Sequence, residues 1–143
     1  MVFNILVNND DDHLRNHGFV LMESPEQPAQ RGAQEPQENV TLAWRISPLY
    51  DVVPRPVHSH HRRLHLGIGA FGKEATLVNA LSWCERFGLN RTDAIAEIDR
   101  IWRVVREWRN YFDASGVTDA DINAVSSAFL HVRDLGGKEV GID

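Results

Sequence analysis

The sequence predicts a mainly α-helical fold with one small two-stranded β-hairpin, and three observations lead to this prediction. Apolar residues recur with helical spacing between Leu77 and Val132. Two short apolar segments, Phe19–Met22 and Thr41–Ile46, lie close enough along the chain to pair as a hairpin. Pro and Gly recur between residues 47 and 72, so we expect irregular structure there.

Composition narrows the classes of protein to which the chain can belong. Its 143 residues suit a single domain, and its net charge of -5 argues against direct nucleic-acid binding. No apolar run approaches the roughly 20 residues of a membrane span, and the N-terminus lacks the features of a signal peptide. We therefore expect a cytoplasmic protein without membrane contact. The single cysteine, Cys84, falls in a helical pattern and is expected to be a buried thiol.

The N-terminal half combines short apolar runs with a polar insertion. The run from Val2 to Val7 is either a strand or the last turns of a helix, because its periodicity fits both. Since the run starts abruptly, we expect it to expose an apolar face that associates with another chain. Residues 23–39 are rich in Gln, Pro and Glu, so they are predicted to form a flexible insertion at the tip of the hairpin.

The C-terminal half is predicted to form three helices, over residues 77–87, 92–115 and 119–135. Gly88, Gly116 and Gly136 are expected to end them, and Asn90 or Thr92 and then Thr118 to cap the second and third. Trp102 and Trp108 fall on the apolar stripe of the second helix, so we interpret them as core residues rather than a ligand site.

Two segments carry the residues most suited to chemistry. The stretch Asn8-Asn9-Asp10-Asp11-Asp12-His13 crowds carboxylates between apolar elements, and a nearby cation would relieve their mutual repulsion. The second segment, Ser47-Pro48-Leu49-Tyr50-Asp51, follows a strand-like run and leaves Asp51 among apolar neighbours. Taken separately, each segment is equally well explained as a solvated turn.

Together and in this order, the two segments resemble the HipA-like kinase family. The pattern is Asp11-x-His13-x-x-Asn16 followed by a strand, and then Ser-Pro-x-Tyr-Asp ending at Asp51. The resemblance implies a fragment of a protein-kinase-like C-lobe from a serine/threonine kinase, often the toxin of a toxin–antitoxin pair. It implies that Asp11 is the catalytic carboxylate and that His13 shapes its loop. Asn16 and Asp51 would hold the Mg²⁺ that accompanies ATP, since Mg²⁺ prefers oxygen ligands.

The chain departs from a complete kinase in its phosphate-binding parts. Its only lysines, Lys73 and Lys138, follow the catalytic loop. The stretch Gly67-x-Gly69-x-x-Gly72 matches a phosphate-loop pattern but comes after Asp51, so we interpret it as a turn into a helix. We therefore expect a catalytic-lobe portion that is inactive without an ATP-gripping N-terminal part.

The expected partners follow from the same resemblance. They are a missing N-terminal lobe, an antitoxin-like DNA-binding protein and a protein substrate. The alternative interpretation is a non-catalytic interaction module, or a gene remnant, that binds an antitoxin-like or kinase partner. A last candidate is a zinc site at His58, His60, His61 and His65, but the charges of Arg62 and Arg63 disfavour a cation, so a solvated loop is the preferred interpretation.

Overall fold

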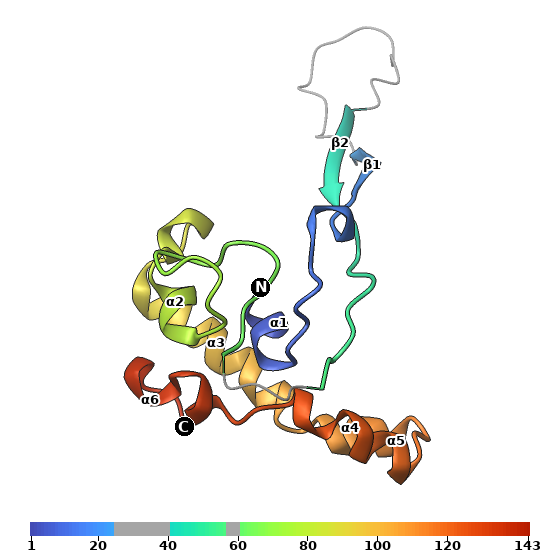
Figure 1. The fold of residues 1–143 in the computed structure, drawn as a ribbon. Coiled ribbons are helices and arrows are strands. Elements are labelled where there is room, and N and C mark those ends of the chain that lie inside the picture. The colour runs from blue at the N-terminus through green and yellow to red at the C-terminus, as the bar shows by residue number, and fades with distance from the viewer. Residues whose placement is uncertain (25–40, 57–60) are drawn as a thin grey trace, which may run out of the picture. The chain divides into compact units, whose positions relative to one another are not determined.

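The structure is a computed structural model that describes residues 1–24, 41–56 and 61–143 (Figure 1). The described residues form two compact units, and each is considered by itself. The first contains residues 1–13 and 51–143, and the second contains residues 14–50. Most of the expected insertion, residues 25–39, lies outside the described residues, whereas Glu23 and Ser24 belong to a strand.

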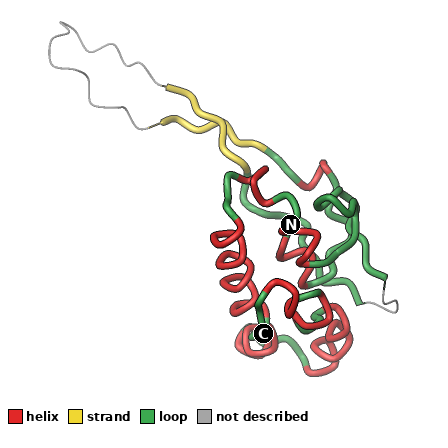
Figure 2. The backbone as a smooth tube through the Cα atoms, turned by 90° about the vertical axis from the view of Figure 1, so that its left-hand side faces the viewer, coloured by secondary structure: helices red, strands yellow, loops and turns green. Residues whose placement is uncertain are grey.

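The second unit is the predicted hairpin, preceded by one short 3₁₀ turn. The turn η1 (Leu14–Asn16) leads into β1 (Phe19–Ser24), which pairs antiparallel with β2 (Thr41–Ile46) (Figure 2). Phe19 lies opposite Ile46, so the first residue of β1 faces the last residue of β2. Beyond the strands, the Tyr50 hydroxyl donates a hydrogen bond of 2.7 Å to the Arg15 carbonyl oxygen and closes the base of the hairpin.

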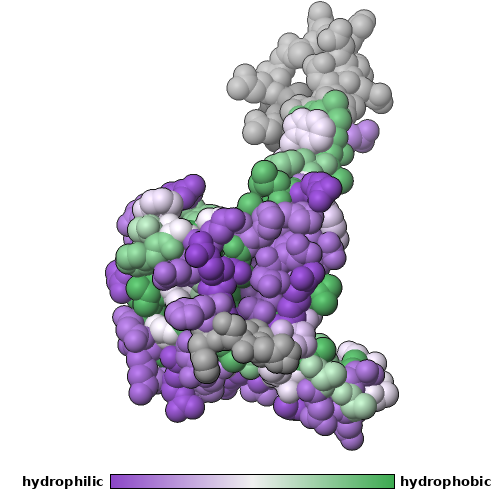
Figure 3. Space-filling model, in the orientation of Figure 1, coloured by the Kyte–Doolittle hydropathy of each residue, from purple (hydrophilic) through white to green (hydrophobic). Residues whose placement is uncertain are grey.

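The hairpin presents apolar side chains to solvent. Paired residues of an antiparallel ladder share one face of the sheet, and here one face collects five large apolar side chains. Their exposed fractions run from 49% to 69%, and Figure 3 shows the green of apolar residues over this part of the chain. They are Phe19, Leu21, Leu42, Trp44 and Ile46. Two strands alone cannot bury both faces, so the described residues of this unit leave the surface uncovered.

The first unit begins with helix α1 (Val2–Leu6), which is buried at its C-terminal end. Ile5, Leu6 and Val7 have no exposed surface, and α1 packs against α3 (Arg91–Val105). The ambiguous run is therefore a helix. The expectation that it exposes an apolar face is wrong for Ile5, Leu6 and Val7, which the helices of the C-terminal half cover, whereas Phe3 is 37% exposed.

The predicted helix over residues 77–87 is interrupted. It consists of α2 (Leu77–Leu81), capped by the Thr76 side chain, and the 3₁₀ turn η2 (Cys84–Phe87). The break falls at Ser82, whose hydroxyl donates to the Asn79 carbonyl oxygen and accepts from the Ala70 backbone N–H. Such side-chain to backbone hydrogen bonds compete with the helical ladder and favour a break. The end is as expected, because Gly88 adopts a left-handed conformation with φ of 71°.

The second predicted helix is also divided. Its first part is α3, capped by Asn90, whose side chain accepts a hydrogen bond of 2.9 Å from the Asp93 N–H. After Arg106 and Glu107 the chain continues as α4 (Trp108–Ala114). Trp108 stacks on Phe129, with ring centroids 4.1 Å apart, so the direction of α4 follows an aromatic contact with a distant segment.

The third predicted helix is the most fragmented. It starts as expected with α5 (Asp119–Val125), where the Thr118 side chain accepts from the Asp121 N–H. It continues as η3 (Ser126–Ala128) and η4 (Val132–Leu135), which ends at Gly136 as expected, and α6 (Gly137–Val140) follows as a separate helix. The observed helices and the hairpin nevertheless confirm the predicted fold class.

The core of the first unit joins residues from both ends of the sequence. Trp102 is 6% exposed and Cys84 is 3% exposed, so both are core residues as expected. Val132, Leu135 and Ile142 of the C-terminal segment pack into the same cluster as Leu6. Within the described residues, no helix has the length and apolar character needed to cross a bilayer.

Candidate functional site

The polar loop after α1 is tied to that helix by side-chain hydrogen bonds. The Asn4 amide donates to the Asp12 carboxylate at 2.6 Å, and the Asn9 amide donates to the Asn4 side-chain oxygen at 3.3 Å. Asn8 turns the chain with a φ of 51°, a left-handed conformation that Asn tolerates better than most residues. The loop that carries Asp11 is therefore held by α1 rather than free in solvent.

Arg55 joins this loop to the segment that follows Asp51. Its backbone N–H donates to the Val7 carbonyl oxygen at 3.3 Å, and its own carbonyl oxygen accepts from the Asn8 amide at 2.9 Å. Its guanidinium lies 2.8 Å from the Asp11 carboxylate and 3.5 Å from that of Asp10. Within the first unit, Arg55, four residues after Asp51, therefore ties the segment that follows Asp51 to the loop that carries Asp11.

The carboxylate of Asp11 remains accessible despite its ion pair. The side chains of Asp11 and Arg55 are 50% and 49% exposed. An ion pair this exposed contributes under about 1 kcal/mol to stability, so a ligand can exchange with it at little cost. Asp51 is also exposed and has a φ of 55°, which orients its side chain differently from an extended residue.

The predicted site residues are distributed over both units. Asp11, His13 and Asp51 belong to the first unit, whereas Asn16 ends η1 in the second unit and is buried. The expected convergence of Asn16 with Asp11 and Asp51 on one Mg²⁺ centre therefore stays a prediction. The oxygen donors of these side chains are of the type that Mg²⁺ prefers.

His13 lies in a partly covered position beside a second imidazole. Its ring centroid is 5.8 Å from that of His65, and the two rings are nearly perpendicular, at 83°. Among the described residues, no group forms a hydrogen bond with the enclosed Nδ1 of His13. The ring contacts His65, and the expected role of His13 in shaping the loop stays a prediction.

Arg62 is a buried residue of this region that sequence reasoning missed. It is 8% exposed, and its Nε–H donates a hydrogen bond of 2.7 Å to the side-chain oxygen of Asn8. Burial lowers the pKa of Arg62 to about 10, although the charge of Asp10 acts in the opposite direction. The sequence signal that could have found it is its spacing from Leu64. Residues two apart in an extended segment lie on the same side, and Leu64 is buried.

The glycine motif is a turn that leads into α2. Gly69 and Gly72 form a short antiparallel bridge, and Gly72 has a φ of 65°. The Phe71 N–H donates to the Asn79 side chain, which in turn donates to the carbonyl oxygens of Gly72 and Glu74. The interior of the turn is thus filled by Asn79, which leaves the motif a structural role.

The histidine cluster is only partly described. His58 and His60 lie outside the described residues, and His65 contacts His13. Where the structure does describe the chain, it brings together no three His, Cys, Asp or Glu side chains that could hold a metal ion. The preferred interpretation, a solvated loop, stays a prediction because His58 and His60 are not described.

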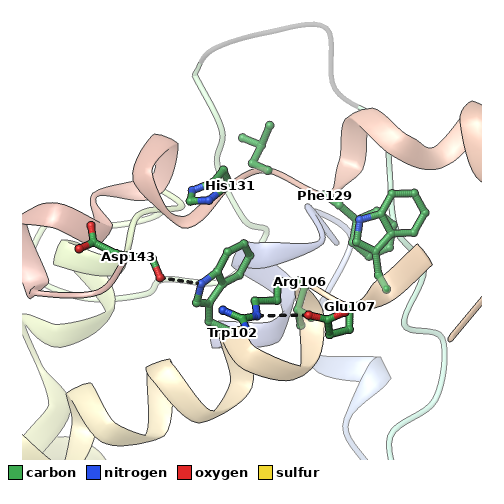
Figure 4. Close-up of a pocket in the computed structure, with 9 residues that line it drawn as sticks. Trp102, Arg106, Glu107, Phe129, His131 and Asp143 are labelled. Carbon is green, nitrogen blue, oxygen red and sulfur yellow. Dashed lines mark hydrogen bonds and ion pairs between the residues drawn. The ribbon is translucent and has the colours of Figure 1, made fainter. Parts of the chain in front are cut away.

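A pocket of about 440 Å³ lies elsewhere in the first unit, between the end of α3 and the C-terminal segment (Figure 4). Trp102 forms one wall, and its indole N–H donates to the Asp143 carbonyl oxygen at 3.2 Å. His131 packs edge-on against Trp102, and Phe129 forms part of the far side. The pocket is open and holds none of the predicted site residues.

The region that contains both motifs is also the region that a family model recognises. The model of the HipA-like C-terminal domain matches residues 1–108. The chain belongs to this family. The HipA-like C-terminal domain thus covers α1, the polar loop, the hairpin and α3, whereas α5 and α6 lie beyond the matched residues. No curated protein and no solved structure gives a significant match to the chain.

Proposed function

We propose that this chain is the catalytic-lobe portion of a HipA-like ATP-dependent serine/threonine kinase. The main support for the proposal is the set of contacts made by Arg55. Its ion pair and backbone hydrogen bonds link the Asp11 loop to the segment after Asp51. A phosphoryl-transfer centre needs a carboxylate to orient the substrate hydroxyl and a second one to hold metal. Membership of the family supports these roles for the two aspartates.

In this proposal each residue has a distinct task. Asp11 aligns the hydroxyl of a protein substrate for attack on the phosphate. Asp51 and Asn16 supply oxygen ligands to Mg²⁺, which neutralises charge on the phosphates of ATP. His13, packed against His65, keeps the loop in shape. The proposed setting is the cytoplasm, with an antitoxin-like DNA-binding protein as partner.

The 143 residues hold no Gly-rich loop and no lysine ahead of the catalytic loop, where a complete kinase carries them, and the two lysines are Lys73 and Lys138. We therefore expect no phosphate transfer from radiolabelled ATP and Mg²⁺ to a generic protein substrate by this chain alone. Transfer that disappears in Asp11→Ala would contradict this part of the proposal.

The metal centre can be tested without catalysis. Mn²⁺, which replaces Mg²⁺ at oxygen sites, should broaden the NMR signals of Asp51 and Asn16 in the presence of ATP. In Asp51→Asn, about ten times more Mn²⁺ should be needed to reach the same broadening. Asp113→Asn, at an exposed carboxylate on α4, should leave the broadening unchanged. Equal broadening in both variants would refute the metal-binding role of Asp51.

The exposed apolar face of the hairpin supports the second candidate function, a non-catalytic interaction module. Five large exposed apolar side chains on one face of a sheet are typical of a surface that contacts another protein. The two functions differ in one outcome: an interaction module keeps its partner affinity when Asp11 and Asp51 are both replaced by Asn.

A further inference from the structure

Arg62 is a buried cation with incomplete hydrogen bonding. A guanidinium carries five N–H donors, and Arg62 uses Nε to reach Asn8. Its Nη1 and Nη2 atoms are enclosed, and no described residue accepts a hydrogen bond from either. Four N–H groups of a residue that is 8% exposed thus lack a described acceptor.

The charge of Arg62 persists at neutral pH. Burial lowers the pKa to about 10, which still lies well above 7, so the guanidinium remains protonated. A buried charge with unused donors is unfavourable unless an anionic acceptor completes it. Deprotonation does not provide relief here, so an acceptor is the remaining way to satisfy the group.

The backbone holds Arg62 in a fixed place. Its carbonyl oxygen accepts from the Ala75 N–H at 3.0 Å, and the next residue but one, Leu64, donates to the Lys73 carbonyl oxygen at 3.0 Å. Asp10 is the acid whose charge acts on Arg62, but its carboxylate is engaged with Arg55 at 3.5 Å. The backbone of Arg62 is therefore fixed, and its guanidinium is anchored through Nε to Asn8, near an acid that pairs with Arg55.

We propose that the Nη1 and Nη2 edge of Arg62 binds a phosphate group beside the Asp10–Asp11 loop. The planar fork matches two oxygens of one phosphate, a geometry that the ammonium of a lysine cannot provide. The inference rests on the proposed function, in which phosphates of ATP or of a product reach this loop. It assigns to Arg62 a phosphate-holding role beside this loop.

Two features of the surroundings shape how the phosphate binds. The enclosed fork becomes accessible only when neighbouring side chains move, and the half-exposed, loosely held pair of Asp10 and Arg55 costs little to displace. Asp10 repels a bare anion, and a bound Mg²⁺ reduces that repulsion. Phosphate should therefore bind more tightly as its Mg²⁺ complex.

The test follows the melting temperature of the full chain and the NMR signal of the Arg62 Nε–H during titration with Mg²⁺-pyrophosphate. Parallel titrations use inorganic phosphate, ADP and succinate. Wild-type protein should show a saturable rise in melting temperature and a shift of the Arg62 signal with the phosphate compounds. ADP that binds no better than pyrophosphate would identify the phosphate itself as the recognised group, and tighter ADP binding would point to a nucleotide.

Matched variants decide whether Arg62 is responsible. Arg62→Met should weaken pyrophosphate binding at least tenfold, the effect of losing one charge-assisted hydrogen bond. Without ligand, removal of the buried charge offsets the loss of its hydrogen bond to Asn8, so the variant should melt close to the wild-type temperature. Arg63→Met makes the same change in charge at the exposed neighbouring residue and should alter affinity less than twofold.

Several results would overturn the inference. These are an absent saturable response in wild type, a preference for succinate, or equal affinities in Arg62→Met and Arg63→Met. Arg62→Lys keeps the charge without the fork and should fold yet bind at least tenfold more weakly. If both Arg62 variants fail to fold, the residue is a structural cross-link and the phosphate role is wrong. Mn²⁺ broadening that depends on Asp51 would then still support the proposed metal-binding role of Asp51, independently of Arg62.

Discussion

The Asn8 side chain should contribute about 3 kcal/mol to the free energy of unfolding, because it is buried and forms hydrogen bonds with two partners. Asn8 is 6% exposed, donates to the Arg55 carbonyl oxygen at 2.9 Å and accepts from Arg62 Nε at 2.7 Å. A hydrogen bond between neutral groups contributes about 1 kcal/mol and one to a charged group about 2 kcal/mol. Asn8→Gly removes both bonds and keeps the backbone free to turn, so we expect a loss of about 3 kcal/mol.

Two further variants separate the backbone from the side chain. Asn8→Ala loses the same bonds and must also hold a φ of 51°, which costs a residue with a Cβ about 1–2 kcal/mol. The greater entropy of an unfolded Gly offsets part of this cost, so Ala should be about 1 kcal/mol less stable than Gly. Asn8→Asp keeps an acceptor for Arg62 and loses the donor, so its loss should be about 1 kcal/mol.

Urea unfolding followed by circular dichroism measures these differences, with the slope of free energy against urea as a check on two-state behaviour. If the free energy of unfolding of Asn8→Gly lies within about 0.5 kcal/mol of the wild-type value, the Asn8 side chain does not hold the loop. If Asn8→Ala is as stable as Asn8→Gly, the left-handed turn contributes nothing.

Two other predictions concern the glycine turn and the hairpin. Gly69→Ala should destabilise the first unit by about 3 kcal/mol or more, because a Cβ there would overlap the Asn79 carbonyl oxygen, whereas Gly67→Ala meets no atom within 4 Å and should be neutral in the same urea assay. Equal stability of the two variants would refute the close approach of the turn to α2. The chain should self-associate through the hairpin at micromolar concentration, and Trp44→Lys, at a residue 69% exposed, should weaken association about tenfold in sedimentation equilibrium. Trp83→Lys, at an exposed Trp of the first unit, is the control, and a clean wild-type monomer would contradict the prediction.

The sequence predicted those features that short-range chemistry determines. The caps at Asn90 and Thr118 and the helix end at Gly88 depend on residues within one turn of each other, and all three occur as expected. The hairpin followed from two apolar segments and the turn-forming residues between them. The motif around Asp11 and Asp51 led to the family for the same reason, since its spacing is written along the chain.

The tertiary structure decided what depends on partners far away in sequence. The run at Val2–Val7 was expected to be exposed, but Ile5, Leu6 and Val7 are covered by helices that begin at Leu77 or later. The long helices expected over residues 92–115 and 119–135 are both broken. Trp108 of the first range stacks on Phe129 of the second. Arg55 and Arg62 belong to the candidate site only because they reach Asp11 and Asn8, which lie 44 and 54 residues earlier. Periodicity reports the environment of a residue relative to its neighbours in the chain, whereas an ion pair or a buried guanidinium depends on which distant segment the fold places beside it.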